Sequence, residues 1–423
     1  MLKILNILGI IILLGVLYLF SNNKKEVNKK MIIKAFVIQF VIAFLLVKFP
    51  IGRIVLEKVS DIVTTILSYG QEGISFVFGQ LADSQMPTGS IFAIQVLCNI
   101  IFISALVAAL YYLGIIGFVV KTIGGAIGKI LGTSKVESFV AVANMFLGQT
   151  ESPIVVSKYL GKMTESEIML VLISGMGSMS AAVLMGYAGM GIPMQYLLIA
   201  GALVPLGSII VSKLIFPEKI IQTSNEKATD NEKGSVDLLE AEVATTKEEL
   251  DDITIDNKGN NTNLISAISQ GASDGLSMAL NIGASLIAII SLVALVNGVL
   301  GVFGLSLEKI LSIIFAPIGF LMGMSKENIL TASQLLGSKL VLNEFVAFGQ
   351  LGEIINTLDY RSGLMMAISL AGFANISSMG VCISGISVFC PEKRGVLSKL
   401  ALRGMLGGFC VSLLSALIVG LIV

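Results

Sequence analysis

The chain has 423 residues, of which 55% are hydrophobic and only 13% are charged. A soluble domain carries about twice that charged fraction, so the composition excludes an ordinary soluble protein. Lysine plus arginine and aspartate plus glutamate each number 28, so the charge does not indicate a nucleic-acid partner. Apolar runs of about 18–25 residues, each long enough to cross a bilayer as a helix, recur along the chain. We predict an all-α polytopic membrane protein.

The composition also restricts the chemistry of the chain. The sequence contains no histidine, which is the commonest general base and metal ligand. Its cysteines form no CxxC pair and lie in apolar surroundings, which is typical of small buried side chains. They are Cys98, Cys382, Cys390 and Cys410. We therefore predict no catalytic residue and no organic cofactor.

Residues 1–89 are predicted to hold the N-terminal helices of a scaffold. The apolar run at 2–21 lacks a small-residue cleavage site and is followed by a lysine-rich turn at 24–30. It is therefore predicted to be a membrane helix with a cytoplasmic C-terminal end rather than a cleaved signal. A second helix is predicted at 31–49. Residues 52–68 mix charges into an apolar pattern, which favours an amphipathic helix at the membrane interface.

A first repeat is predicted at residues 90–216, beginning with a membrane helix at 90–120. Ser134 and Glu137 have the spacing of a capping box, which marks the start of a new helix. This helix runs into the sequence GQTESP, in which glycine and proline interrupt helical structure. The apolar stretch that follows is too short to span a bilayer. We therefore predict a re-entrant hairpin at 134–161 with a polar tip.

A second capping box, Thr164 to Glu167, opens the next predicted helix. This helix covers 165–190 and is interrupted by the sequence SGMGSMSAA. A further helix at 193–215 completes the repeat. Residues 217–262 are polar and acidic and lack apolar periodicity, which predicts a disordered cytoplasmic linker between two halves.

A second repeat is predicted at residues 263–423, beginning with a long apolar segment at 263–303. Proline and glycine in the sequence FAPIGFLMG break what would be one helix, which predicts a second re-entrant hairpin at 308–350. A helix at 360–388, interrupted at AGFANISSMG, and a last helix follow. With eight membrane helices both termini lie outside, and the basic turns then lie inside, as the positive-inside rule requires.

The two halves of the chain repeat one pattern, which we interpret as inverted repeats. Each half has a hairpin with a glutamate, followed by a helix that glycine and serine interrupt. Glu151 precedes the interruption at 175–180, and Glu344 precedes that at 372–378. Paired broken segments at corresponding positions indicate the midplane binding site of a secondary transporter.

The first hairpin tip is a candidate ligand site. A carboxylate in hydrocarbon, such as that of Glu151, must be paired, protonated or hydrated. With Gln149 and Thr150 beside it, the tip presents side chains suited to the edge of a planar, hydrogen-bonding ligand such as a nucleobase. The alternative is a structural network that ties the hairpin to a helix.

The second hairpin contains the adjacent residues Asn343 and Glu344. A carboxylate beside a carboxamide suits a ligand with vicinal hydroxyl groups, such as ribose, because the carboxylate accepts from both hydroxyls. The alternative is a buried ion pair between Glu344 and Lys339, although their spacing of five residues aligns them poorly on a helix.

The interrupted helix at 360–388 carries small polar residues that suit a sugar. Asn375, Ser377 and Ser378 can hydrogen-bond hydroxyl groups, and Phe373 can pack against an apolar face. Small polar residues also join membrane helices to one another, so a purely structural role is the alternative.

A cation site is a weaker prediction from the first repeat. Sodium is often coordinated by side-chain oxygens together with backbone carbonyls where a helix unwinds. Asn144 precedes the first hairpin tip by about one turn, and Ser178 lies where Gly175 and Gly177 interrupt the next helix.

At these residues the chain resembles the concentrative nucleoside transporters. The matching motifs occur in the family's order over essentially the whole chain. They are FVFG at 76–79, GQTESP at 148–153, GYAGMG at 186–191, NEFVAF at 343–348, GFANISS at 372–378 and PEKR at 391–394. The long acidic linker and a short connection at 349–360 depart from the family pattern.

The resemblance implies a homotrimer, eight membrane helices and two re-entrant hairpins per protomer, and a transport path in each protomer. It also implies the roles of individual residues. Those facing the nucleobase are Gln149, Thr150, Glu151 and Val183; those holding the ribose are Glu344, Asn375 and Ser378, with Phe373 beside it. The sodium ligands are the side chains of Asn144 and Ser178 and the carbonyls of Leu147 and Met179.

We therefore expect a sodium-coupled symporter that imports nucleosides across the cytoplasmic (inner) membrane by alternating access. The presence of both Asn144 and Ser178 favours sodium over protons. Membrane lipid and the nucleoside are the expected partners. The alternatives are a proton-coupled symporter, a nucleoside-binding membrane sensor, and an intramembrane enzyme with Glu151 and Glu344 as an acid–base pair. The preferred nucleoside and the ion stoichiometry stay open.

Overall fold

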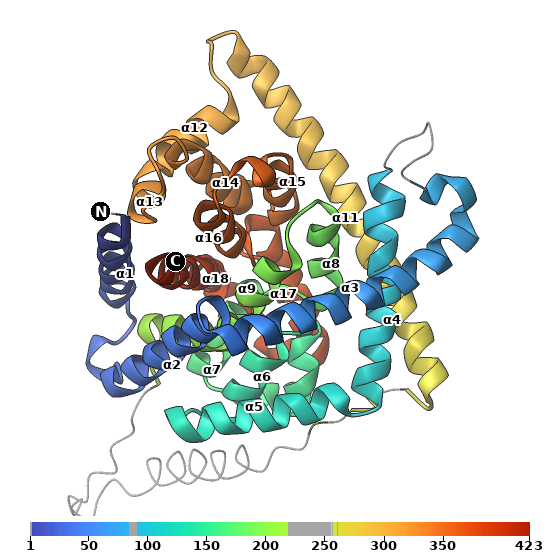
Figure 1. The fold of residues 1–423 in the computed structure, drawn as a ribbon. Coiled ribbons are helices and arrows are strands. Elements are labelled where there is room, and N and C mark those ends of the chain that lie inside the picture. The colour runs from blue at the N-terminus through green and yellow to red at the C-terminus, as the bar shows by residue number, and fades with distance from the viewer. Residues whose placement is uncertain (1, 84–90, 219–254, 256, 260) are drawn as a thin grey trace, which may run out of the picture.

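The computed structural model describes the chain except residues 1, 84–90, 219–254, 256 and 260. Every regular element in the described part is helical (Figure 1). The predicted linker at 217–262 therefore falls largely outside the described residues.

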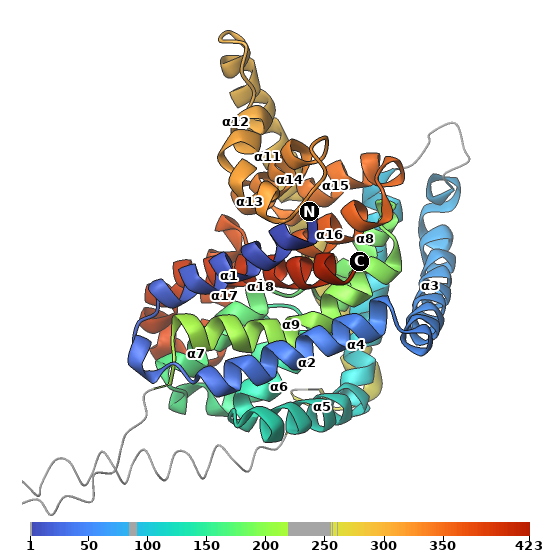
Figure 2. The same cartoon turned by 60° about the vertical axis from the view of Figure 1, so that its left-hand side comes forward.

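The N-terminal helices cover one side of the molecule. Helices α1 and α2 pack against α9 and α18, which lie nearly parallel to them in Figure 2. The predicted interfacial helix at 52–68 is part of a longer helix, α3, which begins at Pro50, a residue suited to a first helical turn. The bounds are α1 Leu2–Leu19, η1 Lys24–Glu26, α2 Lys29–Val47, α3 Pro50–Phe78 and η2 Gly79–Ala82.

The membrane helix predicted at 90–120 is present but shorter than predicted, at Ala93–Tyr112. The structure has a π-helical turn, η3 (Ala93–Leu97), continued by α4 (Cys98–Tyr112), and then a separate helix, α5 (Ile115–Leu131). Gly114 lies between α4 and α5 with a φ of 78°, a left-handed conformation that glycine adopts without strain. The chain therefore turns where the apolar pattern suggested continuity.

The first hairpin is formed by α6 and the 3₁₀-helix η4, and the broken helix after it by α7 and α8. Both predicted capping boxes are present, at Ser134 and at Thr164. They are joined to each other, because Ser134 Oγ donates to Glu167 Oε1 at 2.9 Å. The bounds are α6 Lys135–Ala143, η4 Ser152–Lys162, α7 Glu165–Met176, α8 Ala181–Gly189 and α9 Met194–Ile215.

The second hairpin differs from the predicted segment 308–350. Helices α12 and α13 are separate elements, and the hairpin consists of α14 and α15 with its turn at Leu342 and Asn343. Asn343 sets this turn because its side chain accepts from Val346 N and so caps α15. The bounds are α11 Leu264–Gly301, α12 Leu307–Ile314, α13 Ala316–Leu321, α14 Ile329–Val341, α15 Glu344–Ile354 and η5 Ile355–Thr357.

The two broken helices touch each other at their interruptions. Gly372, with a φ of 103°, lies so close to Gly177 that a Cβ atom on Gly372 would be 2.8 Å from the Gly177 carbonyl carbon. Phe373 N donates to Ser178 O at 3.1 Å and joins the two breaks. The remaining bounds are α16 Tyr360–Leu370, α17 Ile376–Phe389, η6 Pro391–Lys393 and α18 Arg394–Ile422.

Within the described residues, seven helices are long and apolar enough to cross a membrane. They correspond to seven of the eight predicted spans. The predicted span at 360–388 is not among them; the break after Leu370 divides it into α16 and α17. The span Glu165–Gly189, which is among the seven, is likewise divided by a break, into α7 and α8.

Candidate functional site

A cavity of about 500 Å³ lies where the two hairpin tips, α8, the start of α17 and the long helix α11 meet. Every residue predicted to contact a nucleoside lines this one cavity, although the residues come from four separate segments of the chain. They are Gln149, Thr150, Glu151, Val183, Asn343, Glu344, Phe373, Asn375 and Ser378. The structure thus brings together the residues that the sequence singled out.

The first hairpin tip is a compact turn. Gly148 N donates to Glu151 Oε2 at 3.2 Å, so the glutamate closes its own turn. Gln149 Oε1 accepts a hydrogen bond from Cys382 Sγ of α17 at 3.2 Å. Gly175 allows the tip to approach α7, because a Cβ atom there would lie 3.2 Å from Gln149 Cβ. The tip is held against two neighbouring helices while its side chains face the cavity.

The second hairpin tip holds its glutamate through residues of other elements. Glu344 is the first residue of α15, where free backbone N–H groups favour a negative charge. Asn375 Nδ2 donates to Glu344 Oε2 at 2.6 Å, and Tyr187 Oη donates to Oε1 at 3.4 Å. Asn375 is fixed in turn, because its Oδ1 accepts from Ser378 N at 2.9 Å. The Glu344 carboxylate is therefore oriented by protein groups alone.

Tyr187 was not among the predicted site residues. It is fully buried in α8, and its ring stacks on Phe348 with centroids 4.1 Å apart and planes inclined by 22°. It also contacts Phe345 at 4.9 Å between centroids. The sequence signal was the tyrosine in GYAGMG, but a lone aromatic residue in an apolar helix does not reveal a distant partner.

Lys339 does not form the direct ion pair with Glu344 that was considered as an alternative. Its Nζ donates to Ser369 O at 3.0 Å, Ala371 O at 2.8 Å and Ser412 Oγ at 2.8 Å. An ammonium group has three N–H donors, so these bonds use all of them. The Lys339 Nζ atom also lies over the Phe409 ring, 5.5 Å from the ring centroid.

The residues predicted to bind sodium lie where the first hairpin meets the break between α7 and α8. Asn144 Oδ1 accepts from Ser178 Oγ at 3.3 Å, and Asn144 Nδ2 donates to Ser174 Oγ at 2.9 Å. Leu147 and Met179 are buried in the non-helical segments that adjoin this pair. Neutral oxygens beside unwound backbone are the donor set that sodium takes in transporters, so these residues fit such an ion.

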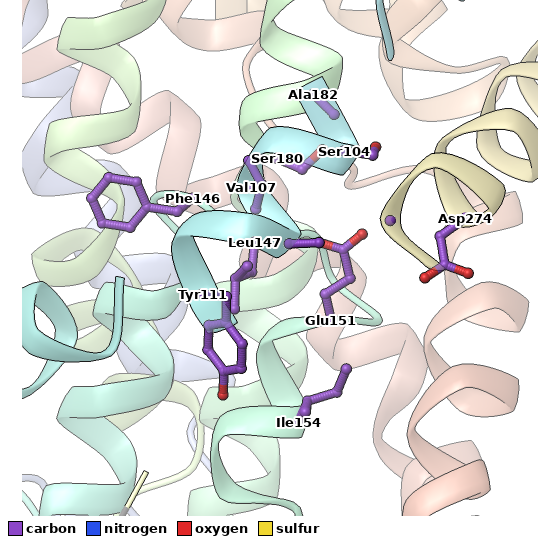
Figure 3. A pocket seen from close by; sticks show the side chains of 12 residues that line it. Ser104, Val107, Tyr111, Phe146, Leu147, Glu151, Ile154, Ser180, Ala182 and Asp274 are labelled. Atoms are coloured by element: carbon purple, nitrogen blue, oxygen red, sulfur yellow. The ribbon is translucent and has the colours of Figure 1, made fainter. Parts of the chain in front are cut away.

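A smaller cavity of about 130 Å³ adjoins the first hairpin (Figure 3). Glu151 of the hairpin and Asp274 of α11 lie on facing sides of it, and both residues also line the larger cavity. Asp274 accepts a hydrogen bond from Gln270 Nε2 at 2.8 Å. The two cavities therefore meet at these two carboxylates.

One wall of the larger cavity is a polar stripe on α11 that the sequence analysis missed. This α11 stripe consists of Asp274, Ser277, Asn281 and Ser285. These residues recur at helical spacing and line the cavity. Its direction is set by tight packing of α11 on α4. A Cβ atom on Gly275 would lie 2.8 Å from Ile101 Cα.

Comparisons with known proteins cover both halves of the chain. A family profile described as the Na⁺ dependent nucleoside transporter C-terminus matches residues 196–420. The profile of the corresponding N-terminus matches residues 8–81, and one described as nucleoside recognition matches residues 93–194.

Individual relatives are similar over nearly their full length. The nucleoside permease NupC of Helicobacter pylori is 36% identical over 100% of this chain and 98% of its own. An uncharacterized transporter of Haemophilus influenzae is 36% identical over 99% and 97%. A solved structure of CNTnw in an inward-facing, substrate-bound state is 34% identical, has a TM-score of 0.88, and covers 100% of this chain and 99% of CNTnw.

Proposed function

The chain belongs to the concentrative nucleoside transporter family, and from that premise we propose that it imports nucleosides by sodium-coupled symport through the inner membrane. It is a nucleoside transporter and not an enzyme, as its relatives are permeases. The observation that carries the proposal is the single cavity lined by all the residues predicted to contact a nucleoside.

The two hairpin tips would take different parts of the ligand. Gln149 and Glu151 offer a donor and acceptors at one end of the cavity, which matches the hydrogen-bonding edge of a nucleobase. Thr150 and Val183 would shape the space around the base. Glu344, already oriented by its neighbours, would accept from the vicinal hydroxyls of ribose at the other end.

Asn144, Ser178 and the carbonyls of Leu147 and Met179 would hold the coupling ion. A bound sodium ion supplies positive charge that joins the first hairpin to the break between α7 and α8. Gln149 and Glu151 follow Asn144 closely in the sequence. An ion that fixes Asn144 would therefore also fix the hairpin tip that faces the base. Ion and nucleoside then raise each other's affinity by the same factor.

Transport would occur by movement of the hairpins and broken helices relative to a scaffold that includes α4 and α11. The α11 stripe would be the stationary polar wall along which the ligand passes. The outer face of α11 exposes large apolar side chains, such as Leu280 at 64% and Ile287 at 73%. Such a face suits lipid or a neighbouring protomer, and we propose a homotrimer.

Uptake of labelled uridine and adenosine into proteoliposomes tests this function. The vesicles receive an inward sodium gradient or an inward proton gradient at matched voltage. Accumulation driven by sodium is the expected result. Accumulation driven only by protons would overturn the sodium assignment, and binding without accumulation under either gradient would indicate a sensor.

A further inference from the structure

The two halves of the transporter make the same connection in two chemically different ways. In each half, the first helix of the hairpin is tied to the break in the broken helix that follows. In the first half, Asn144 at the end of α6 contacts Ser178 in the break. In the second half, Lys339 near the end of α14 binds the carbonyls of Ser369 and Ala371 at the break.

The carbonyl groups exposed at the break after α16 favour a positive charge nearby. The last carbonyl groups of a helix have no intrahelical partners, and they form the negative end of the helix dipole. The Lys339 ammonium, fully buried, places three donors and a positive charge at this end. A buried charge within a membrane protein is costly and usually functional, so a lysine at this position requires an explanation beyond packing.

We propose that Lys339 is the permanent cation of the second half and performs there the task that the exchangeable sodium ion performs in the first half. The inference rests on the proposed sodium coupling. Its consequence is that hairpin 2 (α14 and α15) holds Glu344 in place at all times, whereas hairpin 1 (α6 and η4) is completed only when an ion binds. Only one of the two equivalent positions then exchanges a cation during transport.

Replacing Lys339 by serine tests the proposal, because Lys339→Ser removes the ammonium and leaves space and an oxygen for an ion. Nucleoside binding to the purified full chain is measured over a range of sodium concentrations, with choline keeping the ionic strength constant. The wild-type Hill coefficient for sodium is expected near one. In Lys339→Ser it is expected to rise toward about two, since the coefficient is limited by the number of sites.

Two further variants separate a cation from a merely structural lysine. Lys339→Met supplies neither charge nor oxygen, so its nucleoside binding is expected to be weak at every sodium concentration. Lys393→Met removes another lysine, whose ammonium donates to a backbone carbonyl, Met163 O, at 2.9 Å and which does not line the cavity. Its Hill coefficient is expected to stay near one, as in the wild type.

The possible outcomes distinguish this inference from the proposed function. Wild-type nucleoside binding that does not depend on sodium would overturn both. Sodium-dependent wild-type binding, together with a Lys339→Ser variant that is weakened equally at all sodium concentrations and keeps a Hill coefficient near one, would overturn only the role of Lys339.

The reverse substitution tests the proposal if Lys339→Ser does not fold. Asn144→Lys places an ammonium at the equivalent position of the first half. This variant is expected to bind nucleoside in choline without sodium. Nucleoside binding that still requires sodium in a folded Asn144→Lys protein would refute the equivalence of the two positions.

Discussion

The two hairpin tips present their glutamates to the cavity in different ways. At the first tip, Glu151 accepts a hydrogen bond from Gly148 N of its own turn at 3.2 Å. At the second tip, Glu344 accepts hydrogen bonds from Asn375 of α17 and Tyr187 of α8. The glutamate of the first tip is held by its own turn, whereas the glutamate of the second tip is held by neighbouring elements.

This difference indicates where coupling resides. A ligand shifts a conformational equilibrium only if it binds the two states with different affinity. The second half, with Lys339 and Asn375 in place, is already complete, so an ion has little there to change. The first half contains neutral oxygens around Asn144 and Ser178, where we propose that an ion binds and completes it. On this proposal, a repeated architecture yields one conditional half, which needs an ion, and one permanent half, which does not.

The largest expected effect of a substitution in the cavity is at Glu344. Glu344→Gln places an amide NH₂ group against the donors of Asn375 and Tyr187. It also removes the charge that we propose accepts from ribose hydroxyls. Charge-assisted hydrogen bonds contribute about 1.5–3 kcal/mol each, so nucleoside binding should weaken about 100-fold or more. Glu151→Gln keeps an acceptor for Gly148 N and should weaken binding only about tenfold.

Equilibrium binding of labelled nucleoside measures both effects. Glu165→Gln is the matched control, because Glu165 is a surface residue that pairs with Lys399 at 3.1 Å. It should bind as the wild type does. Wild-type affinity in Glu344→Gln would contradict the assignment of Glu344 to ribose. Equal losses of affinity in Glu344→Gln and Glu151→Gln would contradict the expected difference between the two glutamates.

The contact between the two breaks provides the next prediction. Gly372→Ala introduces a Cβ atom 2.8 Å from the Gly177 carbonyl carbon at a φ of 103°, which only glycine adopts readily. Gly177→Ala introduces a Cβ atom at the same distance, 2.8 Å, from the Ile173 carbonyl oxygen, but at an ordinary φ of −83°. Gly372→Ala should destabilise the protein by about 3 kcal/mol, and Gly177→Ala by about half as much.

Thermal unfolding of the purified variants in detergent checks this order. The midpoint of Gly372→Ala should be the lowest of the three proteins. Gly125→Ala on α5 is the control, since a Cβ atom there meets no other atom within 4 Å. A Gly372→Ala protein as stable as the control would show that the breaks separate easily.

The third prediction concerns the conditional half. Ser178→Ala removes the hydroxyl that donates to Asn144 Oδ1 and lies in the proposed ion site. Loss of one neutral oxygen ligand should raise the sodium concentration for half-maximal nucleoside binding about tenfold while leaving binding at saturating sodium nearly unchanged. Ser415→Ala, on a buried serine that binds Gln39, is the control. An equal loss at saturating sodium would argue for a structural role of Ser178.

Local features of the fold were predictable from the sequence. The capping boxes at Ser134 and Thr164 involve residues three positions apart, and both are present. The breaks at 177–180 and 371–375 coincide with the interruptions predicted from glycine and serine at 175–180 and 372–378. The helix predicted at 90–120 was predicted too long, because a single residue, Gly114, turns the chain within an apolar run that hydropathy alone cannot divide.

Features that depend on distant partners were not predictable. Lys339 suggested an ion pair with the nearby Glu344, but its ammonium binds carbonyls 30 and 32 residues away. The spacing of the α11 stripe can be read from the sequence, yet its orientation depends on how closely Gly275 packs against α4. Sequence patterns identify faces of helices, and only tertiary packing determines what each face meets.

The smallest expected effect concerns the α11 stripe, which lines the cavity together with both hairpin tips. Asn281 lies on the α11 stripe, and its carboxamide offers a donor and an acceptor to a passing ligand. Asn281→Leu keeps a similar volume but removes both, so initial uptake in proteoliposomes should fall about fivefold, as for the loss of one neutral hydrogen bond.

Ser285→Ala should reduce uptake only about twofold. Ser291→Ala removes the same hydroxyl from the same helix outside the cavity lining, and its uptake should match the wild type. If Ser285→Ala and Ser291→Ala change uptake equally, the ligand does not contact this wall, and the polar groups of α11 serve only to hydrate the cavity.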